Sequence, residues 1–128
     1  MLFKLFIIGA GGFFGAIMRY LVSGWIQSLS QSYRFPWGTL AVNLIGCFLM
    51  GLFFQAADTR HFFSEHTRSL IFVGFLGAFT TFSTFGNETA ILIQDGREAL
   101  AFWNMFLHLA FGLFAVFIGR YSAMLIWR

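Results

Sequence analysis

Charged residues are scarce in this sequence, and their scarcity excludes an ordinary soluble domain. They make up 10% of the 128 residues, whereas soluble globular domains contain about 25%. Apolar residues reach 59%, and the mean hydropathy is +0.77. We therefore interpret residues 1–128 as a single membrane-embedded unit without a second domain. The net charge of +3 indicates basic loops beside anionic lipid and does not indicate a nucleic acid partner.

Cysteine and proline are also nearly absent. Cys47 is the single cysteine, so no disulfide can form within the chain, and no zinc-binding pattern of cysteine and histidine is present. We interpret Cys47 as a small buried apolar side chain. Pro36 is the single proline. It suits the first turn of a helix, where the N–H that it lacks would have no partner.

Long apolar segments dominate what is present, and they fall at residues 3–26, 37–57, 69–93 and 99–126. Each has about 20 residues or more, the length of a helix that crosses a hydrocarbon core of about 30 Å. A polar loop at 27–35, a charged loop at 58–68 and a turn at 95–97 are expected between them. Four spans place both termini on one side of the membrane, and the lysine and arginine distribution mildly favours the cytoplasm.

The first segment contains two features that need an explanation in lipid. Gly11 and Gly15 form a GxxxG pattern, which lets helix backbones approach closely, and we expect this face to support a dimer. Arg19 lies well inside the segment, where inserting an arginine costs about 2.5–3.5 kcal/mol. Arg19 either belongs to a polar pathway or extends its side chain to the membrane surface, and the sequence favours neither interpretation.

Residues 74–88, GFLGAFTTFSTFGNE, carry more hydroxyl groups than a membrane helix requires. Phe79, Phe82 and Phe85 recur every three residues, which predicts one helix face. Glycine and β-branched residues weaken a helix, so a break between Gly77 and Thr80 is expected, with free carbonyl groups that could hold Na⁺. The alternative is a bent helix whose threonine hydroxyls bond back to their own carbonyl ladder.

The polar residues within the spans favour an anion as cargo. Donors are available at Thr39, Asn43, Ser83 and Thr84. Arg19 is the deep charge, and Phe82 and Phe85 can present their positive ring edges to an anion. Glu88 is the only acid within a span and stands near one end. The alternatives are that Asn43 ties two helices together by a hydrogen bond and that the phenylalanines only pack.

Three stretches carry a resemblance to a known family: GGFFGAIMRY at 11–20, PWGTLAVNLIG at 36–46 and GFLGAFTTFSTFGNE at 74–88. With them, the chain resembles the Fluc (CrcB) fluoride channel family over essentially its whole length. The resemblance implies an all-α membrane protein with four transmembrane helices per subunit and a third helix broken near its middle. It also implies a dual-topology antiparallel homodimer with two pores, multi-pass in a bacterial inner membrane.

The resemblance further implies roles for individual residues. Phe82 and Phe85 are expected to line the pores with Asn43, and Arg19 to stand in the vestibule. The backbone carbonyls of Gly77 and Thr80 are expected to hold a structural Na⁺ at the dimer interface. The remaining pathway residues implied are Thr39, Ser83, Thr84, Glu88, Asn104 and His108. The hydroxyl track of the family's fourth helix is incomplete, because Gly112 and Val116 stand at two of its positions.

These observations predict a passive fluoride channel that exports cytoplasmic F⁻ and confers fluoride resistance. An enzyme is not expected, because no nucleophile–base pair is present. A small proton-coupled multidrug exporter is one alternative, but it needs a carboxylate in the first helix, which has none. A non-selective structural or holin-like membrane protein is the other, and it would not require Asn43, Phe82, Ser83 and Phe85 together.

Overall fold

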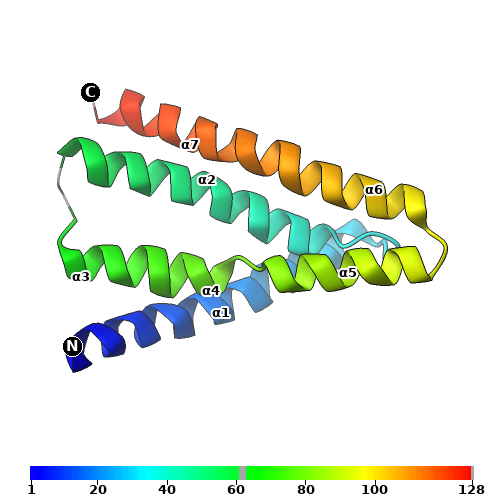
Figure 1. The fold of residues 1–128 in the computed structure, drawn as a ribbon, viewed down its shortest axis with the longest axis horizontal. Helices are drawn as coiled ribbons and strands as arrows, with labels where there is room; N and C mark the ends of the chain where they lie inside the picture. The colour runs from blue at the N-terminus through cyan, green and yellow to red at the C-terminus, as the bar shows by residue number, and fades with distance from the viewer. Residues whose placement is uncertain (61–62, 128) are drawn as a thin grey trace.

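The structure, a computed structural model, describes residues 1–60 and 63–127 and is all-helical over them. Four helical spans are long and apolar enough to cross a membrane: Leu2–Ser30, Trp37–Thr59, Glu65–Gln94 and Glu98–Ile126. Figure 1 shows the spans packed along one another with the two chain termini at the same end of the bundle. The chain is therefore a multi-pass membrane protein, and the predicted number of spans is confirmed.

The first two spans are single helices, α1 (Leu2–Ser30) and α2 (Trp37–Arg60). The third comprises α3 (Glu65–Arg68), the wider π-helical turns of η1 (Ser69–Leu76), α4 (Gly77–Phe79) and α5 (Phe82–Gln94). The fourth comprises α6 (Glu98–Phe106), the π-helical η2 (Leu107–Phe111) and α7 (Gly112–Ile126). The predicted loops at 27–35 and 58–68 are too long, because helix continues to Ser30 and to Arg60 and resumes at Glu65.

The helix boundaries follow from local chemistry. Pro36 directly precedes α2, and its carbonyl oxygen accepts a hydrogen bond from the Leu40 N–H at 3.1 Å, which starts the helical ladder. Gly96 has a φ of +69° between α5 and α6. Only glycine adopts this left-handed conformation without steric cost, so Gly96 allows the sharp reversal into the fourth span.

Glycines bring α1 directly against η1. A Cβ atom on Gly15 would overlap the Phe75 carbonyl, and one on Gly74 would lie 2.6 Å from the Ile8 carbonyl oxygen. A Cβ atom on Gly11 would lie 3.0 Å from the Phe75 nitrogen. The GxxxG pattern therefore packs within the chain, and its predicted use as a dimer face is wrong. Close packing of backbones replaces the hydrophobic effect as the source of helix association in lipid.

A second glycine contact joins α2 to α7. Added Cβ atoms on Gly51 and Gly119 would overlap the backbones of Val116 and Phe48, respectively. Both glycines are buried. The bundle thus contains two tightly packed helix pairs, α1 with η1 and α2 with α7, and the interior polar groups lie between and beside these pairs.

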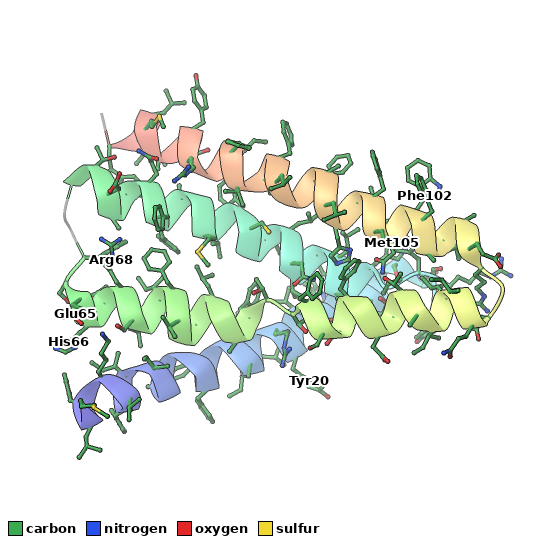
Figure 2. The ribbon with its side chains drawn as sticks, viewed as in Figure 1. Tyr20, Glu65, His66, Arg68, Phe102 and Met105 are labelled. Carbon is green, nitrogen blue, oxygen red and sulfur yellow. The ribbon has the colours of Figure 1, made fainter. Side chains whose placement is uncertain are left out.

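The outer surface is apolar, as lipid contact requires. Figure 2 shows side chains projecting outward along the spans, among them Tyr20 and Phe102. Both are exposed. At the end that carries the termini, the Lys4 ammonium lies 2.6 Å from the Glu65 carboxylate. This exposed ion pair links α1 to α3, although such pairs contribute only about 0–1 kcal/mol.

Candidate functional site

The helix of the third span is interrupted at two threonines between α4 and α5. Thr80 has φ −87° and ψ 157°, and Thr81 has φ −151° and ψ 109°, both extended conformations. The Thr81 hydroxyl accepts a hydrogen bond from the Thr84 N–H at 3.2 Å and donates to the Thr84 hydroxyl at 2.9 Å. Thr81 is therefore the N-cap of α5, a position that threonine favours because its oxygen satisfies a free N–H.

Asn43 holds the extended backbone from the side of α2. Its Oδ1 atom accepts a hydrogen bond from the Thr81 N–H at 2.8 Å, and its Nδ2 atom donates to the Thr81 carbonyl at 3.1 Å. One amide side chain thus satisfies both backbone groups of a residue that no helix satisfies. The structure therefore assigns Asn43 the helix-tying role that the sequence left open.

Several carbonyl groups lose their helical donors at this place, those of Gly77 and Thr80 among them. In a continuous helix, the Thr81 N–H would bond to the Gly77 carbonyl and the Thr84 N–H to the Thr80 carbonyl. Here the first donates to Asn43 and the second to the Thr81 hydroxyl. The Thr80 hydroxyl, in contrast, bonds back to the Leu76 carbonyl at 3.0 Å. The regular donors of the Gly77 and Thr80 carbonyls are consequently directed to other acceptors.

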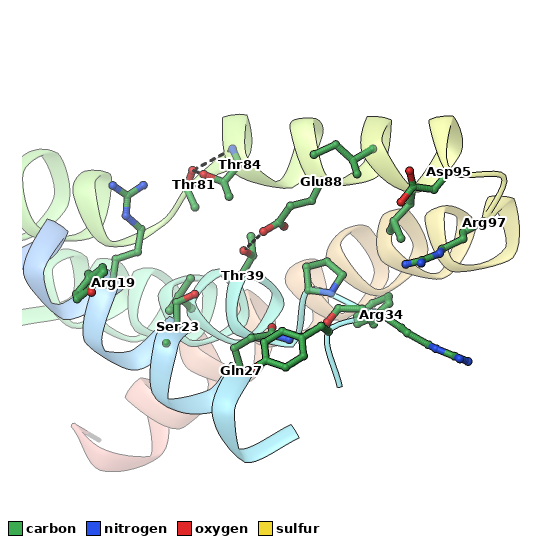
Figure 3. Close-up of a pocket in the computed structure, with 18 of the residues that line it drawn as sticks. Arg19, Ser23, Gln27, Arg34, Thr39, Thr81, Thr84, Glu88, Asp95 and Arg97 are labelled. Atoms are coloured by element: carbon green, nitrogen blue, oxygen red, sulfur yellow. Dashed lines mark hydrogen bonds between the residues drawn. The ribbon is translucent and has the colours of Figure 1, made fainter. Parts of the chain in front are cut away.

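A cavity of about 700 Å³, the vestibule cavity, opens on one side of Thr81. The Thr39 hydroxyl donates to Glu88 Oε1 at 2.7 Å across it, and Glu88 Oε2 is buried without a partner. Figure 3 shows this pair between Arg19 at one end and Arg97 at the other. The other predicted pathway residue lining it is Thr84. The vestibule cavity thus contains both cationic groups and a partly unpaired carboxylate.

A second cavity of about 280 Å³, the aromatic cavity, lies on the other side of Thr81. Four predicted pathway residues line it, namely Asn43, Phe82, Phe85 and His108. Thr80 also lines it. Thr81 lines both cavities. Ser83 and Asn104 line neither, although the Ser83 hydroxyl lies 3.5 Å from that of Thr81.

The two phenylalanines of the aromatic cavity differ sharply in exposure. Their ring centroids lie 5.4 Å apart, but Phe82 is 79% exposed and Phe85 only 8%. Phe79 does not share their face, because the extended residues separate it from α5. It is buried and stacks on Phe75 at 5.8 Å. The prediction of one continuous phenylalanine face is therefore wrong for Phe79.

A buried polar chain connects α5 with the fourth span. The Thr89 hydroxyl donates to the Phe85 carbonyl at 2.8 Å and accepts from Asn104 Nδ2 at 2.9 Å. The backbone carbonyl oxygen of Asn104 lies 2.9 Å from His108 Nδ1. Asn104 is fully buried, and the His108 ring lies 4.3 Å from that of Phe85. Asn104 therefore does not line the cavity itself but contacts His108, which does.

Comparison with known proteins identifies the family of the chain. The family described as CrcB-like protein, Camphor Resistance (CrcB), matches residues 6–120. The chain belongs to the CrcB family. Its relatives include the fluoride-specific ion channel FluC of Campylobacter lari, 46% identical over 121 residues, 93% of this chain and 96% of the relative.

Two further relatives span similar lengths. The fluoride-specific ion channel FluC of Shewanella sp. (strain ANA-3) is 45% identical over 117 residues, 91% of this chain and 93% of its own. FluC 1 of Methanosarcina acetivorans is 41% identical over 123 residues, 96% of this chain and 92% of its own. These names describe ion channels and not enzymes.

Sequence reasoning missed two residues of this CrcB-family site. Thr81 joins both cavities and caps α5, and a capping signal was available, because a threonine followed by a run that resumes helical spacing is typical of an N-cap. Thr89 anchors Asn104 to α5. No local signal marks Thr89, because a single threonine in an apolar helix commonly bonds back to its own carbonyl ladder.

Proposed function

We propose that this chain is a subunit of a passive fluoride channel in a bacterial inner membrane that exports cytoplasmic F⁻ and confers fluoride resistance. The observation that carries the proposal is the Asn43–Thr81 junction, which stands between a cationic vestibule cavity and a smaller aromatic cavity. The names of the relatives supply the ion, because each is a fluoride-specific ion channel.

The two cavities suit successive stages of anion passage. Arg19 in the vestibule cavity attracts an anion that is still partly hydrated. In the aromatic cavity, the Asn43 amide retains a second N–H beyond the one that bonds to Thr81. The edges of Phe82 and Phe85 carry partial positive charge and can replace part of the lost water. In the aromatic cavity, a small anion would thus exchange hydration for protein donors, and none of the described residues there is a fixed counter-charge that traps it.

A second copy of the chain completes the proposed channel. Around the interruption, Gly77, Phe82, Ser83 and Asn87 are exposed on the surface of the single subunit. Lipid offers no hydrogen bonds to polar side chains or to non-helical backbone, so Ser83, Asn87 and the carbonyl groups at the interruption need protein or water beside them. An antiparallel homodimer would cover this surface with its own copy and would form two equivalent pathways. The dual topology agrees with the weak charge difference between the two ends.

A structural Na⁺ at the dimer interface is part of the same proposal. The Gly77 and Thr80 carbonyls, whose regular donors are directed to other acceptors, are neutral oxygen ligands of the kind that hold alkali cations. Two antiparallel copies would contribute four such oxygens around one ion. In this arrangement Na⁺ stabilises the assembly and is not transported with fluoride.

Fluoride efflux from liposomes that contain the purified protein tests the proposal. We expect rapid fluoride release, no comparable chloride release, and a dimer on crosslinking in detergent. Equal release of both ions would indicate the non-selective alternative. Accessibility of a terminal tag from only one membrane side would contradict the dual topology.

The role of Na⁺ has a separate test. We expect prolonged removal of Na⁺ to reduce fluoride flux slowly, as the site empties, and restored Na⁺ to recover it. Because no stoichiometric coupling is proposed, a Na⁺ gradient should not drive fluoride against its own gradient. Uphill fluoride movement driven by Na⁺ would replace the channel with a transporter.

A further inference from the structure

His108 holds one of its two ring nitrogens in a fixed hydrogen bond. Nδ1 lies 2.9 Å from the backbone carbonyl oxygen of Asn104. A carbonyl oxygen only accepts hydrogen bonds, so Nδ1 carries a proton and donates it. In the neutral imidazole, Nε2 is then the unprotonated nitrogen and presents a lone pair. The backbone of the fourth span therefore selects the tautomer of this ring.

The other nitrogen of His108 has no partner in the part of the chain that the structure describes. Nε2 is buried without a hydrogen bond, and the ring lines the aromatic cavity with Asn43, Phe82 and Phe85. Burial of a polar atom without a hydrogen-bond partner is unfavourable. Nε2 therefore keeps unused hydrogen-bonding capacity on a ring that lines the cavity.

Few other groups around the ring can titrate. Cys47 of α2 is the other titratable side chain among the described residues that line the aromatic cavity. On α5, Glu88 lines the vestibule cavity and bonds to Thr39. On α7, Arg120 lies over the Phe54 ring, 5.5 Å from its centroid. Of these groups, His108 is the one that can change between neutral and positive, and within residues 1–60 and 63–127 no charged side chain lines the same cavity.

We propose that His108 is a proton-controlled anion-binding residue, whose Nε2 binds fluoride in the aromatic cavity when it is protonated. This inference rests on the proposed fluoride channel. The lone pair of the neutral ring repels an anion, whereas the imidazolium offers a charge-assisted N–H donor. The proton comes from water in the cavity and returns to it, so no covalent or redox step is involved. Fluoride permeation is thereby coupled to acidity through one side chain.

The expected effect is a fluoride flux that rises as the pH falls on both sides of the membrane. If only the protonated ring admits the anion, the flux changes by up to about tenfold per pH unit while the imidazole is mostly neutral. We choose the range from about pH 8 to about pH 5 so that the measurement includes the onset of ring protonation.

Efflux from liposomes across this pH range tests the inference, with protein-free liposomes measured in parallel to subtract the leak of HF. We expect His108→Gln, which offers an amide donor that does not titrate, to conduct with a nearly flat pH profile. The matched control is His66→Gln, because His66 is exposed at the terminal end of the bundle and should keep the wild-type profile. A flat wild-type profile, or an unchanged one in His108→Gln, would overturn the inference.

A second test uses only the wild-type protein, so it does not depend on whether His108→Gln folds. It follows the titration of the His108 ring by nitrogen NMR. Because fluoride binds the protonated form, NaF should move the midpoint of the His108 titration to higher pH, and NaCl at the same concentration should not. An identical midpoint in both salts would refute binding at Nε2. Absence of fluoride flux at every pH would instead refute the proposed channel, so the two failures are distinguishable.

Discussion

Replacing Asn43 with aspartate tests the junction between the two cavities at a single atom. Asn43→Asp preserves the shape of the side chain and the oxygen that accepts from the Thr81 N–H at 2.8 Å. It removes the donor to the Thr81 carbonyl, a bond of 3.1 Å, and places a second oxygen opposite that carbonyl. The substitution also puts a negative charge on the wall of the aromatic cavity.

The two consequences have different magnitudes. Loss of one hydrogen bond, with a carbonyl left unpaired, costs about 1–3 kcal/mol of stability. Repulsion between the carboxylate and an anion about 4 Å away amounts to roughly 4 kcal/mol at an effective dielectric constant of 20. Each 1.4 kcal/mol corresponds to about a tenfold change, so the charge would reduce flux by roughly a thousandfold. The electrostatic effect on permeation therefore exceeds the effect on folding.

The assay is fluoride efflux from liposomes, restricted to variants that elute as the wild-type dimer. Gln55→Glu is the matched control, because it makes the same amide-to-carboxylate change on α2 near its end, where Gln55 bonds to Thr59 at 3.1 Å. We expect the control to conduct normally. Wild-type flux in a correctly folded Asn43→Asp dimer would refute the pathway through this junction.

Three further substitutions probe the ring edges, the glycine packing and the vestibule. Phe82→Ile keeps an apolar side chain but removes the ring edge, an interaction of about 0.5–1.5 kcal/mol, so fluoride efflux should fall roughly two- to tenfold. Near-wild-type efflux would return Phe82 to a packing role. Gly15→Ala should destabilise the protein by about 1–3 kcal/mol through overpacking, which a lower thermal midpoint in detergent would report. Gly9→Ala is the control, because no atom lies within 4 Å of a Cβ atom added there, and it should leave the thermal midpoint unchanged. Equal thermal midpoints in the two variants would contradict the packing at Gly15. Thr39→Val should cost about 1–3 kcal/mol by leaving both Glu88 oxygens without partners, whereas equal stability would show that water replaces the hydroxyl.

The span count was predictable because each segment is both long and nearly free of charge. Local signals at Pro36 and Gly96 also placed two boundaries correctly. The ends of α1 and α2 were less predictable, because polar residues such as Gln27 and Asp58 continue a helix once packing has formed it. The partner of the GxxxG face could not be predicted at all. Nothing local distinguishes a contact within the chain from one between chains.

The candidate site was predictable as a set of residue types, not as a set of contacts. Thr39 and Asn43 share a face of α2, yet the structure places them in different cavities, on either side of Thr81. The bonds between Asn43 and Thr81 join residues far apart in sequence. Likewise, the pairing of Asn104 with Thr89 depends on how α5 packs against α6. Such pairings follow from three-dimensional packing, which periodicity does not encode.

The close contact between α2 and α7 separates positions that can change from positions that cannot. Any side chain at Gly51 or Gly119 would push the two backbones apart, so no substitution fits at either position without moving the helices. At Gly112, by contrast, an added Cβ would meet the Cys47 sulfur at 3.6 Å, an ordinary van der Waals contact. A serine could therefore enter at 112 without moving the helices. The frame of this bundle is fixed while the chemistry beside its aromatic cavity stays open to variation, so descendants of this sequence could retune ion passage by single substitutions without refolding.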